Sequence, residues 1–149
     1  ALVDAGEKTG VEVSYCSAYD PTGCGSSGCH CGLTRDNDYN SPTSRWSCKY
    51  DLIEKDCKVC YTFDEPQDIE ELGVSFYKGD KRKRTITLKL DNTNGVDDKT
   101  YEFTSSGDST SYEYFDLSSD ETKKLCIEAE DLDSSEWLSI KEVVFLVDE

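Results

Sequence analysis

Eight cysteines in 149 residues constrain this chain more than any other feature of its sequence. They are Cys16, Cys24, Cys29, Cys31, Cys48, Cys57, Cys60 and Cys126. An even number of cysteines at this density, in a chain without methionine, is typical of an oxidising extracellular compartment and predicts up to four disulfide bonds. The sequence does not reveal the pairing, because eight cysteines can be joined in 105 ways.

A zinc site is the alternative for the stretch CGSSGCHC. Its ligands would be Cys24, Cys29, His30 and Cys31. Zinc modules usually carry two well-separated ligand pairs, whereas these ligands crowd together on a glycine-rich loop. The expected compartment also favours disulfides, and His30 is then an exposed loop residue.

The size and charge of the chain limit its possible partners. A chain of 149 residues is long enough for one domain with one hydrophobic core. The formal net charge of -16 disfavours nucleic acids and anionic membrane surfaces as partners. The longest apolar run, VVFLV, is too short to cross a bilayer. We interpret the sequence as that of a mature secreted chain or of a module of a longer one.

Residues from Trp46 onward show the pattern of short β-strands separated by turns. In ELGVSFY, alternation places Leu72, Val74 and Phe76 on one face of a strand. In RTITLKL, it places Ile86, Leu88 and Leu90 on one face. The segments KVCYTFD, KTYEFTS, SYEYFDL, KKLCIEAE and IKEVVFLVD are similar, with turns such as NTNG and SSGDS between them. Such regular turns, with almost no helical periodicity, predict an all-β antiparallel sandwich or barrel.

Residues 14–45 precede that pattern as a long irregular segment rich in Gly, Ser, Asp and Cys. A loop of this length inside a compact domain is uncommon and is usually functional or cross-linked. Because the segment carries its own cysteines, we interpret it as a disulfide-stapled loop of one domain that spans residues 1–149.

Five basic residues lie within seven positions of this acidic chain: Lys78, Lys81, Arg82, Lys83 and Arg84. If ELGVSFYK and RTITLKL form a hairpin that closes through GDKR, Phe76 lies opposite Ile86 and Lys78 lies opposite Arg84. Strand periodicity then predicts that Lys78, Arg82 and Arg84 line the rim of the sandwich. Lys81 and Lys83 would point into water.

Like charges that oppose each other across a hairpin are unfavourable unless an anion lies between them. That anion is either a carboxylate of a ligand or the protein's own Asp80 or Glu136. Local neutralisation of this kind and ligand binding both remain open at this point.

Three blocks of sequence, SRWSC, CYTFDEPQDIEELGVSFYKGDKR and SEWLSIKEVVF, occur in the order seen in discoidin-like domains. Over about residues 36–149 the chain resembles F5/8 type C domains and family 32 carbohydrate-binding modules, in particular those appended to alginate lyases and found in algal and marine bacterial extracellular proteins. The resemblance implies an eight-stranded jelly-roll β-sandwich with both termini at one end. The cysteine-rich segment lies outside the common pattern.

The resemblance also implies a structural Ca²⁺ ion between the loop before SRW and the final strand. The loop RDNDYNSPTS is dense in the oxygen donors that Ca²⁺ prefers, and Glu142 matches the distant carboxylate of the family. The loop ligands would be Asp36 and Asp38, or Asp38 with the carbonyls of Arg35 and Asn40, followed by Thr43 or Ser44. An Asx-rich turn without a metal is the alternative.

The resemblance and the basic residues together predict a non-catalytic module that binds an acidic polysaccharide of the alginate type or another cell-wall glycan. Uronate carboxylates would meet Lys78, Arg82 and Arg84. Asp80 and Glu136 would orient these bases or accept hydrogen bonds from sugar hydroxyls. Tyr77 or Trp137 would face the apolar side of a sugar ring, whereas Trp46 is assigned to the core.

We expect such a module to be extracellular and monomeric, either alone or within a larger chain. A cell-surface or cell-wall adhesion module that binds protein or matrix through its acidic surface is the alternative. An enzyme is disfavoured, because the lone His30 provides no catalytic triad and the cysteines are expected to be paired. Among 32 acidic residues, a pair of neighbouring carboxylates arises by chance.

Overall fold

The computed structural model describes residues 1–17, 19–49, 57–92, 98–119, 121–130 and 136–149, which form β-strands and three short 3₁₀ helices. The strands are β1 (Leu2–Asp4), β2 (Val11–Cys16), β3 (Trp46–Lys49), β4 (Lys58–Gln67), β5 (Glu71–Phe76), β6 (Thr85–Asn92), β7 (Lys99–Thr104), β8 (Tyr112–Asp116), β9 (Thr122–Glu130) and β10 (Trp137–Asp148). The 3₁₀ helices are η1 (Ala5–Glu7), η2 (Gly25–Ser27) and η3 (Cys31–Arg35). No helix of this described part is long and apolar enough to span a bilayer.

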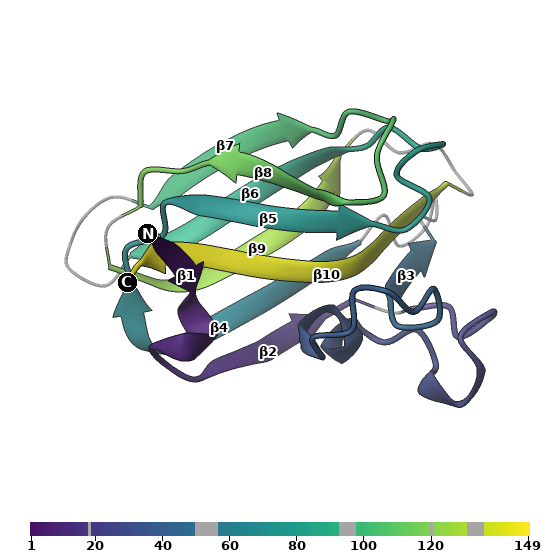
Figure 1. Cartoon of the computed structure of the whole chain (residues 1–149), viewed down its shortest axis with the longest axis horizontal. Helices are drawn as coiled ribbons and strands as arrows, with labels where there is room; N and C mark the ends of the chain where they lie inside the picture. Colours follow the sequence, from purple (N-terminus) through teal and green to yellow (C-terminus); the bar gives the residue numbers. More distant parts are fainter. Residues whose placement is uncertain (18, 50–56, 93–97, 120, 131–135) are drawn as a thin grey trace.

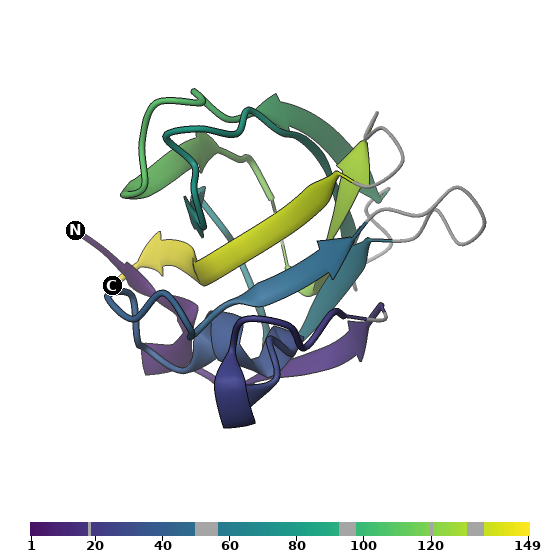
Figure 2. The ribbon, with the colours of Figure 1, turned by 90° about the vertical axis from the view of Figure 1, so that its right-hand side faces the viewer.

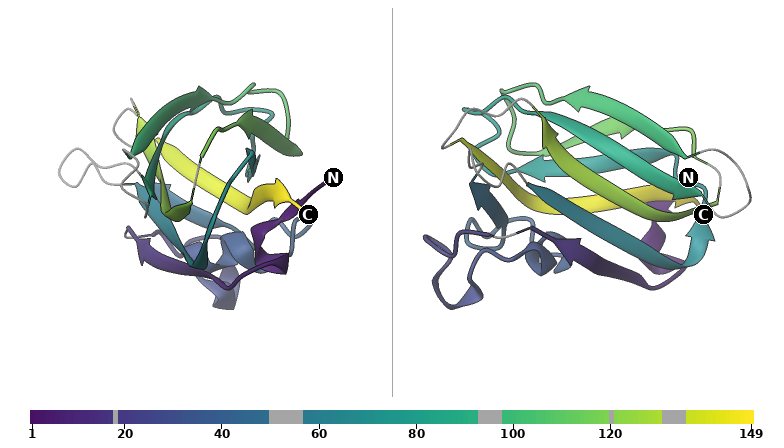
Figure 3. Two further views of the ribbon diagram at one scale, coloured as in Figure 1. Left: turned by 90° about the vertical axis from the view of Figure 1, so that its left-hand side faces the viewer. Right: turned by 180° about the vertical axis from the view of Figure 1, so that it is seen from behind.

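Two antiparallel sheets face each other and form a sandwich. In the first sheet the strand order is β1-β10-β5-β8, and β3 also pairs with β10; in the second it is β2-β4-β9-β6-β7. The first sheet lies in front in Figure 1, and the second lies in front when the molecule is seen from behind (Figure 3, right). Both termini lie at one end, where the N–H of Glu149 donates to the carbonyl of Ala1 over 3.1 Å. The predicted all-β jelly-roll sandwich is therefore confirmed.

The apolar rows predicted from alternation form the core between the sheets. The rows of β5 and β6 are buried, and Trp46 is fully buried, as expected. The rings of Tyr61 and Phe63 on β4 pack edge-on against Phe145 of β10, with centroids 5.0 and 5.1 Å apart. These aromatic contacts join the two sheets at the centre of the core.

The predicted hairpin between the segments that became β5 and β6 is wrong. The strand β5 pairs with β10 and β8 in the first sheet, whereas β6 pairs with β9 and β7 in the second. Residues 77–84 therefore cross from one sheet to the other. Two strands on opposite sides of a core alternate in the same way as two strands of one hairpin, so periodicity alone did not separate these arrangements.

The N-terminal strands were not predicted either. The strand β1 pairs with the end of β10, and β2 pairs with β4. They bring the number of strands in the described residues to ten, whereas the resemblance implied eight. The sandwich therefore includes the start of the chain, which lies before the region of sequence resemblance.

The four predicted disulfides are confirmed, and the zinc alternative is wrong. The pairs are Cys16–Cys31, Cys24–Cys29, Cys48–Cys57 and Cys60–Cys126. The first two staple the irregular segment, which lies beside β2 and β3 when the molecule is seen from the end away from the termini (Figure 2). His30 is exposed on this segment, as expected.

An ion pair anchors the same segment to the sandwich. The guanidinium of Arg35, at the end of η3, donates to both carboxylate oxygens of Asp4 over 2.9 and 2.8 Å and to the carbonyl of Val143 over 2.8 Å. The carboxylate of Asp4 also accepts from the N–H groups of Phe145 and Gly6, both at 2.9 Å. Burial alone would raise the pKa of Asp4, but Arg35 and these N–H groups outweigh it and hold the pKa below its ordinary value.

Candidate functional site

Residues 77–84, which carry the five clustered basic residues and which we call the basic turn, lie at the end of the sandwich opposite the termini (Figure 1). The basic turn follows β5 directly, and the carbonyl of Lys78 accepts the N–H groups of Lys81 and Arg82, both over 2.9 Å. A Cβ on Gly79 would lie 2.2 Å from the carbonyl oxygen of Ser109, so only glycine fits there. The backbone of Lys78 has a positive φ of 55°. This tight turn leaves the side chains of Lys78 and Lys81 exposed.

A pocket of about 330 Å³ opens beside this turn. It is lined by Asn40, Pro42, Tyr77, Lys78, Asp80, Lys81, Thr110 and Lys141. Three of these residues are lysines, and Asp80 is the single carboxylate among them, so an anion would meet a surplus of positive charge here. We call this cavity the lysine pocket.

Two arginines lie against the ring of Tyr77, which is one of the residues that line the lysine pocket. The guanidinium carbon of Arg45 lies 3.9 Å from the centroid of the Tyr77 ring, and that of Arg82 lies 5.7 Å from it. Arg45 is buried and donates to the hydroxyl of Ser47 over 3.0 Å and to the carbonyl of Pro42. Burial and then the charge of Arg84, with a smaller effect of Arg45, lower the pKa of Arg82. Positive charge is therefore concentrated around the ring of Tyr77.

The other arginine predicted to bind the ligand, Arg84, is held in a separate cluster. Arg84 donates to the carbonyl of Trp137 over 2.7 Å and to that of Lys83 over 3.0 Å, and it pairs with Glu136 over 3.2 Å. Only 12% of its side chain is exposed. Of the two alternatives, neutralisation by one of the protein's own carboxylates therefore applies to Arg84, whose partner is Glu136. The residues that line the lysine pocket do not include Arg84, Glu136 or Trp137.

The structure therefore divides the predicted ligand-binding residues. Tyr77, Lys78 and Asp80 meet in the lysine pocket, and Arg82 lies next to Tyr77 and donates to the hydroxyl of Ser139 over 3.3 Å. Sequence reasoning missed Arg45 and Lys141 and pointed Lys81 into solvent away from the site. Arg45 directly precedes Trp46 in the block SRWSC, and Lys141 directly precedes Glu142. Their positions beside recognised residues were the only signal that the sequence offered.

Most of the predicted metal ligands lie on the loop that also lines the lysine pocket through Asn40 and Pro42, whereas Arg35 ends η3 and Glu142 lies on β10. Glu142 is buried, its Oε1 atom has no hydrogen-bond partner, and its carboxylate lies against that of Asp36. Burial first, and then Asp36, raise the pKa of Glu142 to about 8. Asp36 also accepts a hydrogen bond from the hydroxyl of Ser44. Glu142 and Ser44 are buried and Asp36 is exposed, and two carboxylates with a hydroxyl are donors of the kind that Ca²⁺ prefers.

The side chains of the other predicted residues make further contacts, whereas the ligand atoms predicted for Arg35 and Asn40 are their backbone carbonyls. Asp38 accepts the N–H of Ser41 over 3.0 Å, and the hydroxyl groups of Ser41 and Thr43 lie 2.9 Å apart. The side chain of Arg35 pairs with Asp4, and Asn40 lines the lysine pocket. In the part of the chain that the structure describes, no three His, Cys, Asp or Glu side chains gather into a metal site.

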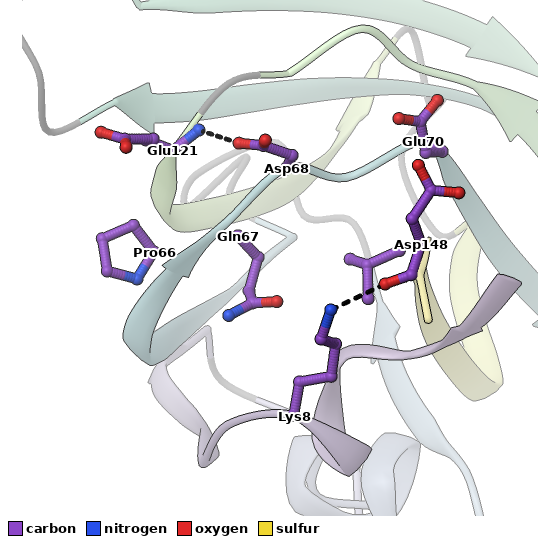
Figure 4. A pocket seen from close by; sticks show the side chains of 8 residues that line it. Lys8, Pro66, Gln67, Asp68, Glu70, Glu121 and Asp148 are labelled. Carbon is purple, nitrogen blue, oxygen red and sulfur yellow. Dashed lines mark hydrogen bonds between the residues drawn. The ribbon is translucent and has the colours of Figure 1, made fainter.

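A second pocket, of about 340 Å³, lies at the end of the sandwich that carries the termini (Figure 4). Four of its eight lining residues are acidic and one is basic: the lining consists of Lys8, Pro66, Gln67, Asp68, Glu70, Glu121, Val147 and Asp148. Asp68 accepts the N–H of Glu121 over 2.7 Å, and Lys8 donates to the carbonyl of Asp148 over 2.8 Å. The two ends of the molecule therefore carry pockets of opposite charge.

Comparison with known proteins gives structural matches only. No family model and no curated protein matches the sequence. A truncated AlyQ with CBM32 and alginate lyase domains matches with a TM-score of 0.68 and 20% identity over 94% of this chain. The chain spans 32% of that AlyQ structure.

The isolated CBM32 of AlyQ, in complex with 4,5-unsaturated mannuronic acid, matches with a TM-score of 0.64 and 19% identity over 91% of this chain and 92% of that one. A pectin-binding carbohydrate-binding module matches with a TM-score of 0.68 and 19% identity, over 91% and 88% of the two chains. An F5/8 type C domain from Bacteroides fragilis matches with a TM-score of 0.70 and 16% identity, over 100% and 97%. The chain therefore has the discoidin-like fold that these carbohydrate-binding modules and F5/8 type C domains share.

Proposed function

We propose that this protein is a non-catalytic, extracellular module that binds an acidic polysaccharide of the uronate type in the lysine pocket. The observation that carries the proposal is the convergence of Lys78, Lys81 and Lys141 on one cavity in a chain of net charge -16. Lysines that served only to keep the surface hydrated would have no reason to converge from two different segments on one cavity. Arg45 and Arg82 add positive charge behind Tyr77.

The residues of the pocket have the chemistry that a uronate needs. Lysine ammonium groups attract carboxylates as mobile point charges, and Asp80, Asn40 and the backbone near Thr110 offer hydrogen-bonding groups to sugar hydroxyls. The acidic remainder of the surface would repel a polyanion. Binding should therefore be local and should weaken as salt is raised, because the Debye length falls from about 10 Å at 0.1 M to about 3 Å at 1 M.

Two structural neighbours support the choice of ligand. The CBM32 of AlyQ was solved in complex with 4,5-unsaturated mannuronic acid, and another neighbour is a pectin-binding module. Their identity to this chain is 19%, so they support a glycan-binding role by analogy of fold, and the charge of the lysine pocket supplies the preference for an acidic glycan.

Calorimetric titration with defined oligouronates and with neutral oligosaccharides of equal length tests the proposal. We expect Lys78→Ala and Lys141→Ala each to weaken oligouronate binding roughly fivefold, the value of one partly exposed charge contact of about 1 kcal/mol. Lys83→Ala is the matched control, because Lys83 is exposed on the same turn and is not among the residues that line the pocket. If the three variants bind alike, the lysine pocket is not the site.

We also propose that the site beside the pocket holds a structural Ca²⁺ ion. Asp36 and Glu142 would provide carboxylate oxygens and Ser44 a hydroxyl, with backbone carbonyls of the same loop completing the shell. The support is the buried Oε1 of Glu142 without a hydrogen-bond partner, because a bound cation would stabilise two neighbouring carboxylates that otherwise repel each other. When bound, the ion would neutralise both carboxylates and join the loop to β10.

An adhesion or structural module remains the second candidate, and the acidic pocket near the termini favours it. Its carboxylates, including Asp68, Glu70 and Glu121, would suit a cationic protein or matrix surface. A glycan array distinguishes the two functions, because the first requires signals for uronate glycans and the second predicts none for any glycan.

A further inference from the structure

A row of tyrosines runs from the lysine pocket along the outer face of the first sheet. The ring of Tyr39 stacks on that of Tyr112 with centroids 5.1 Å apart and an interplanar angle of 14°, and Tyr112 lies 6.0 Å from Tyr114 at 28°. Phe115, the residue after Tyr114, points the other way and packs on Phe103 inside the sandwich, with ring centroids 4.8 Å apart. The tyrosines of β8 therefore face away from the core, on the outer face of the first sheet; the strand itself is labelled in Figure 1.

The far end of the row is an exposed ring placed over a glycine. Tyr114 is 53% exposed and is paired with Gly73 across β8 and β5. A Cβ on Gly73 would lie 2.9 Å from the Tyr114 ring and 2.6 Å from the Val144 side chain. The missing side chain thus lets the ring of Tyr114 rest on the sheet. An aromatic residue this exposed, yet packed against backbone, presents a firm apolar surface to the solvent.

The row is continuous with the lysine pocket. The ammonium of Lys141, which lines the pocket, lies 4.6 Å from the centroid of the Tyr39 ring. Asn40, the next residue after Tyr39, also lines the pocket. Beyond Tyr114 the sheet becomes acidic, because Asp116 of β8 pairs with Glu71 of β5. A polyanion that starts in the pocket therefore finds neutral rings next and negative charge after them.

We propose that the glycan site extends from the lysine pocket along this tyrosine row, which contacts further sugar units of the same polysaccharide chain. The proposal rests on the proposed function of the pocket. Sugar rings have apolar C–H faces, and aromatic side chains such as Tyr114 offer a matching surface at low entropic cost. The site thereby selects an internal segment several units long over a single terminal unit, and the acidic pair beyond Tyr114 limits its length.

Titration with uronates of two and of six units tests this extension. We expect the wild type to bind the six-unit chain more tightly, and Tyr114→Ala to lose about threefold to tenfold of that affinity without changing binding of the two-unit chain. Gly73→Ala should cause the same length-dependent loss, because its Cβ displaces the ring. Tyr19→Ala, which removes a 45% exposed ring from the cysteine-rich segment, is the matched control and should bind both as the wild type does.

The outcomes separate this inference from the function on which it rests. If Tyr114→Ala binds the six-unit chain like the wild type, the extension is wrong and the lysine pocket stands. If the wild type binds neither length, both proposals fail. Resonances of the Tyr112 and Tyr114 rings in the wild type give an answer that needs no variant: they should shift with the six-unit chain alone, and unchanged resonances would overturn the extension.

Discussion

The ion pair between Asp4 and Arg35 provides a sensitive test of how the cysteine-rich segment is held on the sandwich. Asp4→Asn keeps the shape of the side chain and removes its charge, which leaves the guanidinium of Arg35 without a counter-ion. The two side chains retain 17% and 24% exposure, so the cost should lie near the lower end of that for a broken buried pair, at about 3 kcal/mol. For a chain of this length, that loss lowers the melting temperature by about 6–12 °C.

Thermal and urea unfolding of the oxidised protein measure this loss. Lys89→Met is the matched control, because Lys89 pairs with Glu128 over 3.3 Å but 54% of its side chain is exposed. The control should cost no more than about 1 kcal/mol. In a double-mutant cycle, the cost of Asp4→Asn should be much smaller in an Arg35→Met background, where no guanidinium is left unpaired. If Asp4→Asn lowers the free energy of unfolding no more than Lys89→Met does, the ion pair between Asp4 and Arg35 does not stabilise the fold.

Acid gives a second measure with a defined sign. Folding lowers the pKa of Asp4 below its ordinary value of 3.8. The ionised carboxylate therefore stabilises the fold fully at pH values well above 3.8, and this stabilisation is lost as the pH falls through the lower pKa of the folded state. The cost of Asp4→Asn should therefore be constant from neutral pH to about pH 5 and should shrink below about pH 4. A cost that grows in acid would contradict the assigned interaction.

Two further changes test the metal site and the basic turn. Saturating Ca²⁺ should raise the melting temperature of the wild type, with a stabilisation of about 2.7 kcal/mol at a hundredfold excess over its Kd, and Glu142→Gln should abolish the shift; an equal shift in the variant would exclude this site. Gly79→Ala should destabilise the fold by about 1–3 kcal/mol and weaken oligouronate binding, because its Cβ meets the carbonyl of Ser109 and displaces Lys78. Gly25→Ala, whose Cβ meets nothing within 4 Å, should leave binding unchanged.

Local features of the sequence were sufficient for much of the fold. The even number of cysteines predicted disulfides, and all eight are paired. Alternation with a period of two located the strands from β4 to β10 and the core residues of β5 and β6, because a strand buried on one face imposes that period whatever its neighbours are. The short N-terminal strands escaped notice, since three residues such as those of β1 carry no recognisable period.

The candidate site depended on arrangements that no local pattern encodes. Alternation was equally compatible with a hairpin and with two strands on opposite sheets, and only the packed sandwich separated β5 from β6. The turn between them then brought Lys78 to the pocket and left Arg84 beside Glu136. Lys141 reaches the same pocket from β10, more than 50 residues later in the chain.

The sequence by itself determined the class of this protein: an all-β domain with disulfide bonds, a core of alternating apolar residues and an unusual run of basic residues. The tertiary structure decided which of those basic residues are neutralised, which converge on a cavity, and which tyrosines lie side by side next to that cavity. The physical reason is one of range. Periodicity and cysteine number act along the chain, whereas charge neutralisation and pocket formation depend on side chains that meet only after distant strands have packed together.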